Sequence, residues 1–162
     1  MCIRIENRKY TIAKEDIIVY KACKKWGENF YSYYECFKYI PNKRYHSEIS
    51  FRQDSAGYLD GVERMAWLNV DKNILFIEEG FHSCLTMDRL YTYTPTVTGQ
   101  FIIPRGSKIW YGRTNLIVSD TIIFTGKIFT ATEIYKYKRL IKKLGISLNT
   151  IKTLKRQQKN VI

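Results

Sequence analysis

The chain has 162 residues, of which 45% are apolar and 26% charged, the composition of an ordinary folded domain rather than of a disordered chain. Its formal net charge is +12, and aromatic residues make up 15% of it. The sequence lacks both the run of about 20 apolar residues that a membrane-spanning helix needs and the apolar stretch and cleavage site of a signal peptide. We therefore expect a cytoplasmic protein that binds no membrane.

Strand-forming residues occur in short runs along most of the chain. We predict strands over residues 17–22, 30–34, 48–51, 74–77, 100–103, 108–111 and 116–124. A Pro-Arg-Gly-Ser turn at 104–107 separates two of these strands, and residues 85–93 predict a short helix. Short strands joined by turns predict an α+β fold, β-rich and mainly antiparallel, over residues 1–129.

The pattern becomes helical after residue 129. Apolar residues follow the spacing of one helix face at Ile134, Tyr137, Leu140, Ile141 and Leu144. Thr130 or Thr132 is suited to cap this helix, Glu133 stands in its first turn, and Gly145 is suited to end it. A second helix follows, so residues 130–162 predict a C-terminal helical hairpin.

This hairpin is strongly basic, because residues 131–162 hold nine Lys and Arg but one acid, a net charge of +8. Residues 140–154 resemble a helix-turn-helix core, although Ile141 stands where such motifs usually hold a small residue. The resemblance implies DNA or RNA contacts by Ser147, Asn149, Thr150, Lys152, Lys155 and Arg156. The alternative is a hairpin that packs on the body or forms a contact in a homo-oligomer.

The cysteines are spaced too widely to form a recognisable metal site. Cys2, Cys23, Cys36 and Cys84 form no Cys-x-x-Cys pair, and the two histidines are far apart in the sequence. We expect four reduced cysteines that behave as small apolar residues. The sequence predicts no metal and no cofactor.

Three segments of the body resemble ADP-ribosyltransferases. Residues 17–22 are similar to the first strand of that family, residues 79–84 to its Gly-Phe-x-Ser-Thr-Ser strand, and residues 101–108 to the strands and turn after its catalytic Glu. Lys21 replaces the family's Arg or His, and Thr98-Gly99-Gln100 stands where its Glu-x-Glu motif falls. The resemblance therefore implies a degenerate, ADP-ribosyltransferase-like body, and we expect no transferase activity.

The chain also resembles small uncharacterised proteins encoded by phages and prophages. It shares with them a Glu-x-Gly-Phe-His-x-Cys segment at 78–84 and an Ile-Pro-x-Gly-Ser turn at 103–107. This resemblance implies a phage protein that works in the cytoplasm of the host cell. Phage genes of this size often encode antagonists of host defence.

The sequence contains no pair of residues that is well placed for acid–base or nucleophilic catalysis. His82 and Cys84 are suited to share one face of a strand, but side by side they are poorly placed for proton transfer. Glu78 and Glu79 are adjacent, and adjacency does not converge two carboxylates on one substrate atom. The expectation is a protein that is not an enzyme.

Aromatic and basic residues interleave around residues 31–45 and 89–113. Because bases stack on aromatic rings while Lys and Arg pair with phosphates, this composition suits nucleotides or single strands as well as an ordinary Tyr-rich sheet. The leading hypothesis is that the protein sequesters an anionic nucleotide-type immune signal of the host. The predicted ligand-binding residues are Tyr20, Lys21, Phe81, His82, Ser83, Arg105, Ser107 and Lys108. The alternatives are nucleic-acid binding by the tail and an ADP-ribosyltransferase-like enzyme.

Overall fold

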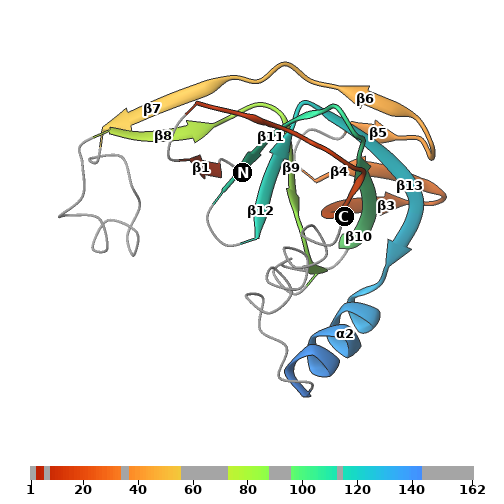
Figure 1. Cartoon of the computed structure of the whole chain (residues 1–162). Helices are drawn as coiled ribbons and strands as arrows, with labels where there is room; N and C mark the ends of the chain where they lie inside the picture. Colours follow the sequence, from red (N-terminus) through yellow and green to blue (C-terminus); the bar gives the residue numbers. More distant parts are fainter. Residues whose placement is uncertain are drawn as a thin grey trace, which may run out of the picture.

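Strands dominate the computed structural model, which describes residues 3–5, 8–33, 37–55, 73–87, 96–112 and 115–143 (Figure 1). The strands are β1 (Ile3–Ile5), β2 (Thr11–Ile12), β3 (Ile17–Trp26), β4 (Asn29–Ser32), β5 (Lys38–Tyr39), β6 (Arg44–His46), β7 (Phe51–Ser55), β8 (Asn73–Ile77), β9 (Phe81–Cys84), β10 (Thr96–Ile103), β11 (Lys108–Tyr111), β12 (Leu116–Ser119) and β13 (Thr121–Phe129). One helix follows them, α2 (Ala131–Lys143). The fold is therefore α+β and β-rich, as the sequence predicts.

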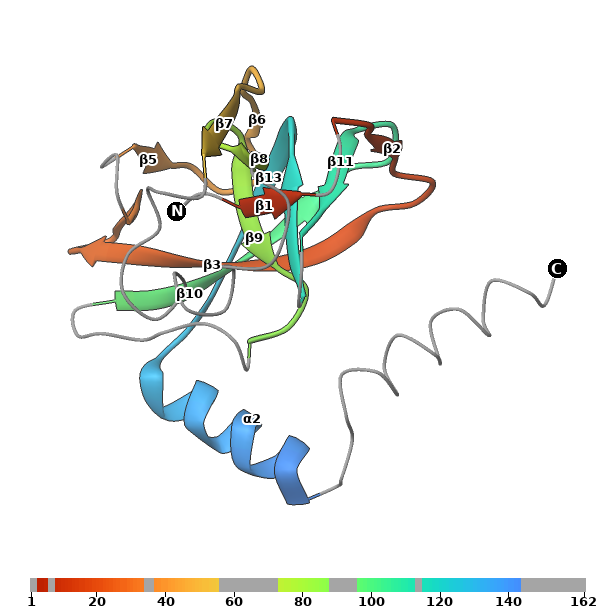
Figure 2. The same cartoon turned by 90° about the vertical axis from the view of Figure 1, so that its left-hand side faces the viewer.

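Two antiparallel sheets make up the body. The larger has the strand order β2-β11-β12-β9-β3-β10-β13-β6, with β4 paired to β3 and β5 paired to β4. The smaller has the order β1-β8-β7. Figures 1 and 2 show that the large sheet is strongly curved and that α2 lies at the opposite end of the molecule from β1, β7 and β8.

The concave side of the large sheet holds the main core. Phe101 and Phe124 are fully buried there, with ring centroids 4.9 Å apart. Val19 and Cys23 of β3 belong to the same core. They are four positions apart in the strand, so their side chains lie on the same face of the sheet. A second, smaller core of Ile77, Trp110 and Val118 lies between the two sheets.

Most predicted strands are confirmed within a few residues, but two expectations fail. No strand covers residues 47–50, and β7 begins only at Phe51. The run 116–124 divides into β12 and β13 at Asp120, which is held by Lys108 and Ser47 through backbone hydrogen bonds of 3.2 and 2.9 Å. Of the helix predicted over 85–93, residues 85 and 86 form a bend and Met87 is in 3₁₀ conformation, and the rest lies outside the described residues, so this helix stays a prediction.

The turn at 104–107 is confirmed, and it places its flanking strands far apart. Gly106 adopts φ +87°, and the backbone N–H of Ser107 donates to the carbonyl of Pro104. The strands on either side, β10 and β11, are not neighbours, because β12, β9 and β3 lie between them. The turn therefore carries the chain from the middle of the large sheet to its far side.

Helix α2 begins with the capping residues that the sequence indicates. The backbone N–H of Thr130 donates to Glu133 Oε2 at 2.7 Å, and the N–H of Glu133 donates back to the Thr130 hydroxyl at 3.4 Å. Ile134 is buried against the sheet, whereas Leu140, expected on the same apolar face, is 53% exposed. The predicted second helix lies outside the described residues.

Candidate functional site

A hollow of about 460 Å³ opens where β9 separates from β3. The two strands share a single registered pair, Tyr20 with Cys84, and from Cys23 onward the same edge of β3 pairs with β4 instead. The residues that line the hollow are Tyr20, Lys21, Ala22, Ser32, Tyr33, Phe37, Tyr39, Tyr45, His46, Ser47, Glu78, Glu79, Gly80, Phe81, His82, Ser83, Cys84 and Leu116. The volume falls within the range of small-molecule sites.

Lys21 lies in the gap between the two strands. Its position in β3, between the buried residues Val19 and Cys23, places it on the core-facing side by strand alternation. Its ammonium donates to the carbonyl oxygen of His82 at 2.5 Å and lies 5.9 Å from the centre of the Phe81 ring. A positive charge therefore stands in the hollow where the ladder between β3 and β9 stops.

The thiol of Cys23 lies on the same side of β3 as Lys21 and feels its charge. Burial raises its pKa from 9.0 to about 11, and the positive charge of Lys21 opposes this shift without cancelling it. The thiol is thus protonated at neutral pH. A protonated buried thiol serves packing rather than nucleophilic chemistry.

Aromatic rings form one wall of the hollow. Phe37 lies edge-on to Tyr39 and Tyr45, with centroids 5.5 and 5.1 Å away. The Tyr45 hydroxyl accepts a hydrogen bond of 2.6 Å from the backbone N–H of Ile40, which fixes its ring. Tyr39 and Tyr45 are buried, whereas Phe37 is 44% exposed at the mouth. The wall is therefore preorganised, with one ring free to meet a ligand.

Buried and charged polar groups complete the lining. The Ser83 hydroxyl is 3% exposed and has no hydrogen-bond partner among the described residues. Glu78 and Glu79 stand at the entrance, and the carboxylate of Glu78 is paired with Arg52 at 2.7 Å. A ligand can thus meet an ammonium and aromatic rings in one place, with the buried Ser83 hydroxyl in the lining.

Five of the eight predicted ligand-binding residues line this hollow. They are Tyr20, Lys21, Phe81, His82 and Ser83. Arg105, Ser107 and Lys108 do not line it, since the turn that carries them leads to β11 on the far side of the sheet. There the Ser107 hydroxyl is buried and donates to the carbonyl of Pro104, and the backbone N–H of Arg105 donates to Asp16.

Sequence reasoning missed several residues of the hollow, among them Phe37, Tyr39 and Tyr45. These residues belong to the segment 31–45, where aromatic and basic residues alternate. That pattern indicates a composition suited to nucleotides, but it does not show which of the residues line a common hollow. No sequence pattern indicates a binding role for His46, and Glu79 is considered only as one of two adjacent carboxylates. They reach the hollow only through the curvature of the sheet and the turn before β9.

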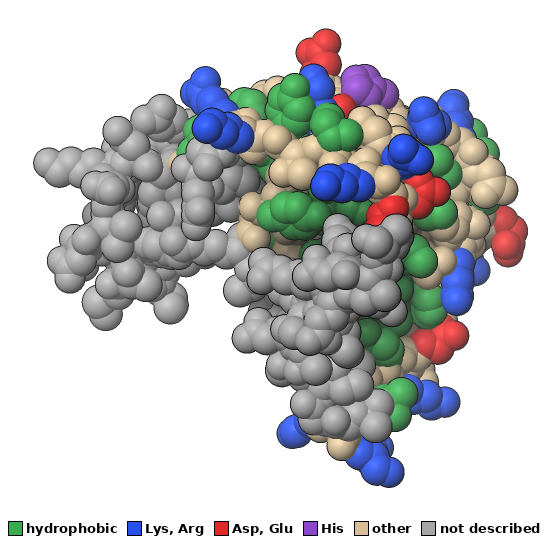
Figure 3. Space-filling view, viewed as in Figure 1, with side chains coloured by type: hydrophobic (Ala, Val, Ile, Leu, Met, Phe, Trp, Pro, Cys, Tyr) green, Lys and Arg blue, Asp and Glu red, His purple; other side chains and the backbone are tan. Residues whose placement is uncertain are grey.

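Basic side chains also gather on α2. Lys136, Arg139, Lys142 and Lys143 are exposed, and Figure 3 shows blue side chains at the lower end of the molecule, where this helix lies. The predicted base-contacting residues, Ser147 to Arg156, lie outside the described residues. Nucleic-acid binding by the tail therefore stays a prediction.

Comparison with protein-family models, curated proteins and solved structures found no match to this chain. Within the described ranges, no cluster of His, Cys, Asp and Glu is suited to hold a metal ion. Helix α2, with 13 residues, is too short to cross a bilayer, and no other described helix qualifies.

Proposed function

We propose that the protein binds an anionic nucleotide-type small molecule in the hollow between β9 and β3, without transforming it. The observation that carries this proposal is the ammonium of Lys21 beside aromatic rings in a space of about 460 Å³. A ring system of the ligand would lie against Phe37 or Phe81, and an anionic group would pair with Lys21. In a phage, such binding would sequester an immune signal of the host.

Binding rather than catalysis is favoured by the groups available. The lining offers a cation, rings and a buried hydroxyl, and the pKa of Cys23 keeps its thiol protonated. One of the two carboxylates at the entrance, Glu78, is already paired with Arg52.

Isothermal titration of the full chain tests the proposal with ADP-ribose derivatives, cyclic oligonucleotides and mononucleotides. Lys21→Met should weaken the best ligand at least tenfold, since it removes one half of a desolvated charge pair. Lys14→Met is the matched control, because Lys14 is exposed and does not line the hollow. Equal affinities for the two variants, or no heat from any compound with the wild type, would contradict the proposal.

Because Lys21 also joins β3 to β9, its loss can lower stability. Phe37→Ala provides a second variant, since Phe37 is half exposed at the mouth and makes no hydrogen bond through its side chain. It should weaken the same ligand roughly 5- to 100-fold, the range of one stacked base. Thermal unfolding of each variant establishes that the protein being titrated is folded.

A further inference from the structure

A row of aromatic and basic side chains crosses the outer side of the molecule where β2, β11 and β7 meet. The Lys108 ammonium lies 5.0 Å from the Tyr10 ring, and Arg8 lies 5.5 Å from the Phe51 ring. Between these two pairs stands Trp110, with ring centroids 5.7 Å from Tyr10 and 6.0 Å from Phe51. We call these five residues the basic-aromatic row.

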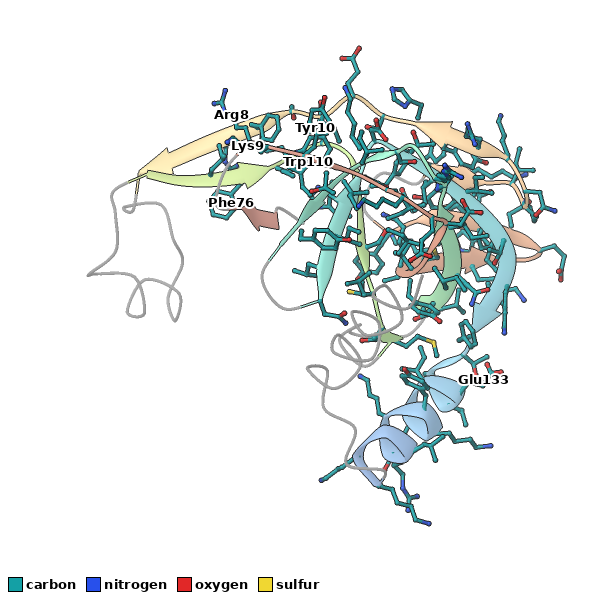
Figure 4. The ribbon with its side chains drawn as sticks, viewed as in Figure 1. Arg8, Lys9, Tyr10, Phe76, Trp110 and Glu133 are labelled. Carbon is teal, nitrogen blue, oxygen red and sulfur yellow. The ribbon has the colours of Figure 1, made fainter. Side chains whose placement is uncertain are left out.

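The row is separate from the hollow, and its residues are held in place. Trp110 is 5% exposed, and its indole N–H donates to the backbone carbonyl of Arg8 at 3.1 Å. Tyr10 rests edge-on against this buried ring and is itself 51% exposed. Figure 4 shows Arg8, Tyr10 and Trp110 close together on one side of the molecule. The row therefore presents an open aromatic face on a fixed support.

Positive charge stands at both ends of the row. Arg8 and Lys108 are exposed, and Arg52 on the neighbouring β7 lies 5.8 Å from the Phe76 ring. Glu78 pairs with Arg52, and Asp120 accepts a hydrogen bond from the backbone N–H of Lys108, with no ion pair recorded between Asp120 and the Lys108 ammonium among the described residues. The cations of Arg8 and Lys108 thus face solvent on either side of the aromatic rings.

From this arrangement we infer that the basic-aromatic row binds single-stranded nucleic acid. An unpaired base stacks on the open face of Tyr10, and the phosphates on either side of it pair with Arg8 and Lys108. A duplex keeps its bases stacked inside and offers Tyr10 no base face. The Tyr10 ring therefore explains the preference for single strands, and the charges of Arg8 and Lys108 explain the salt dependence of binding.

Fluorescence anisotropy with a labelled 20-nucleotide oligo-dT tests this inference on the full chain. Tyr10→Ala should weaken binding roughly 5- to 100-fold, the range of one stacked base, and Tyr10→Phe should retain wild-type affinity. Tyr111→Ala is the matched control: Tyr111 is 54% exposed, but strand alternation places it on the other face of β11 from Trp110. It should change affinity less than twofold.

The cations are tested in the same way. Arg8→Gln should lower the slope of log affinity against log salt by about 0.7, the value for one phosphate contact on a single strand. Arg44→Gln removes an equally exposed charge from β6, far along the sheet order from β11. It should leave the Tyr10-dependent part of the binding intact, even though the basic tail adds its own electrostatic attraction.

Three results would overturn the inference. The first is equal affinity of Tyr10→Ala and Tyr111→Ala for oligo-dT. The second is a 20-base-pair duplex that binds as tightly as the single strand, and the third is binding of phosphatidylserine vesicles with the same dependence on Tyr10. Lys21→Met separates the two proposals, because it should leave oligo-dT binding unchanged whether or not the hollow takes a nucleotide.

Discussion

Replacing Gly80 by alanine should destabilise the protein far more than a glycine-to-alanine change at an open turn. Gly80 lies between β8 and β9 with φ +120°, a conformation that side chains rarely adopt. A Cβ placed there would stand 2.6 Å from Ile49 Cδ1 and 2.8 Å from Val118 Cγ1. Both neighbours belong to the packing between the two sheets, so the chain has to move.

The magnitude follows from two separate costs. Backbone strain at such a φ is worth about 1–3 kcal/mol, and overpacking a filled site costs about 1–3 kcal/mol. We therefore expect Gly80→Ala to lower the free energy of unfolding by roughly 2–6 kcal/mol. Since Gly80 precedes Phe81, the substitution should also displace the wall of the hollow and weaken ligand binding.

Urea unfolding, followed by fluorescence, measures this effect with Gly27→Ala as the control. Gly27 has φ +55°, but a Cβ there would meet nothing within 4 Å. Its substitution should cost about 1 kcal/mol, from backbone conformation alone. If the two variants differ by less than about 0.5 kcal/mol, the close approach at Gly80 does not carry the energy that we assign to it.

Three further predictions concern other parts of the chain. Arg105→Ala should change nucleotide affinity less than about twofold, as an ordinary surface substitution does. A tenfold loss of affinity in isothermal titration would show instead that the 104–107 turn takes part in ligand binding. The raised pKa of Cys23 means that its contribution to stability is complete below the unfolded value of 9.0 and is lost as the pH rises through about 11. The stability of the wild type should thus fall more steeply over this window than that of Cys23→Ala in urea titrations; parallel curves would show that the thiol does not titrate in this way. Hydrogen bonds from Thr130 lower the pKa of Glu133, so the cap should be fully present above 4.5 and be lost as the pH falls through the lowered folded value. NMR signals of α2 should report this loss in the wild type and not in Glu133→Gln.

The sequence predicts the strands of this protein better than it predicts their arrangement. Composition and alternation identify β3, β8, β10 and β11, because burial of one face or both leaves a local pattern. The division at Asp120 leaves no such pattern. It depends on hydrogen bonds to Lys108 and Ser47, residues 12 and 73 positions away in the chain.

The residues of the candidate site were also easier to predict than their arrangement in space. Tyr20, Lys21 and Phe81 to Ser83 line the same hollow because β3 and β9 are neighbours, and their binding of a common ligand stays a prediction. The sequence groups Arg105 with them because residues 101–108 resemble a third segment of the ADP-ribosyltransferase family. The sequence could not show that the next strand lies beyond β9 and β12, so the turn points elsewhere.

We propose that the hollow holds an anionic nucleotide-type molecule through Lys21, and mass spectrometry can identify small molecules that heat releases from the protein. The protein is purified from phage-infected or signalling cells as the wild type, Lys21→Met and Lys14→Met. Wild type and Lys14→Met should release a nucleotide-type anion that is depleted at least tenfold in Lys21→Met. The absence of such a compound from the wild type, or equal amounts from all three proteins, would contradict the proposal.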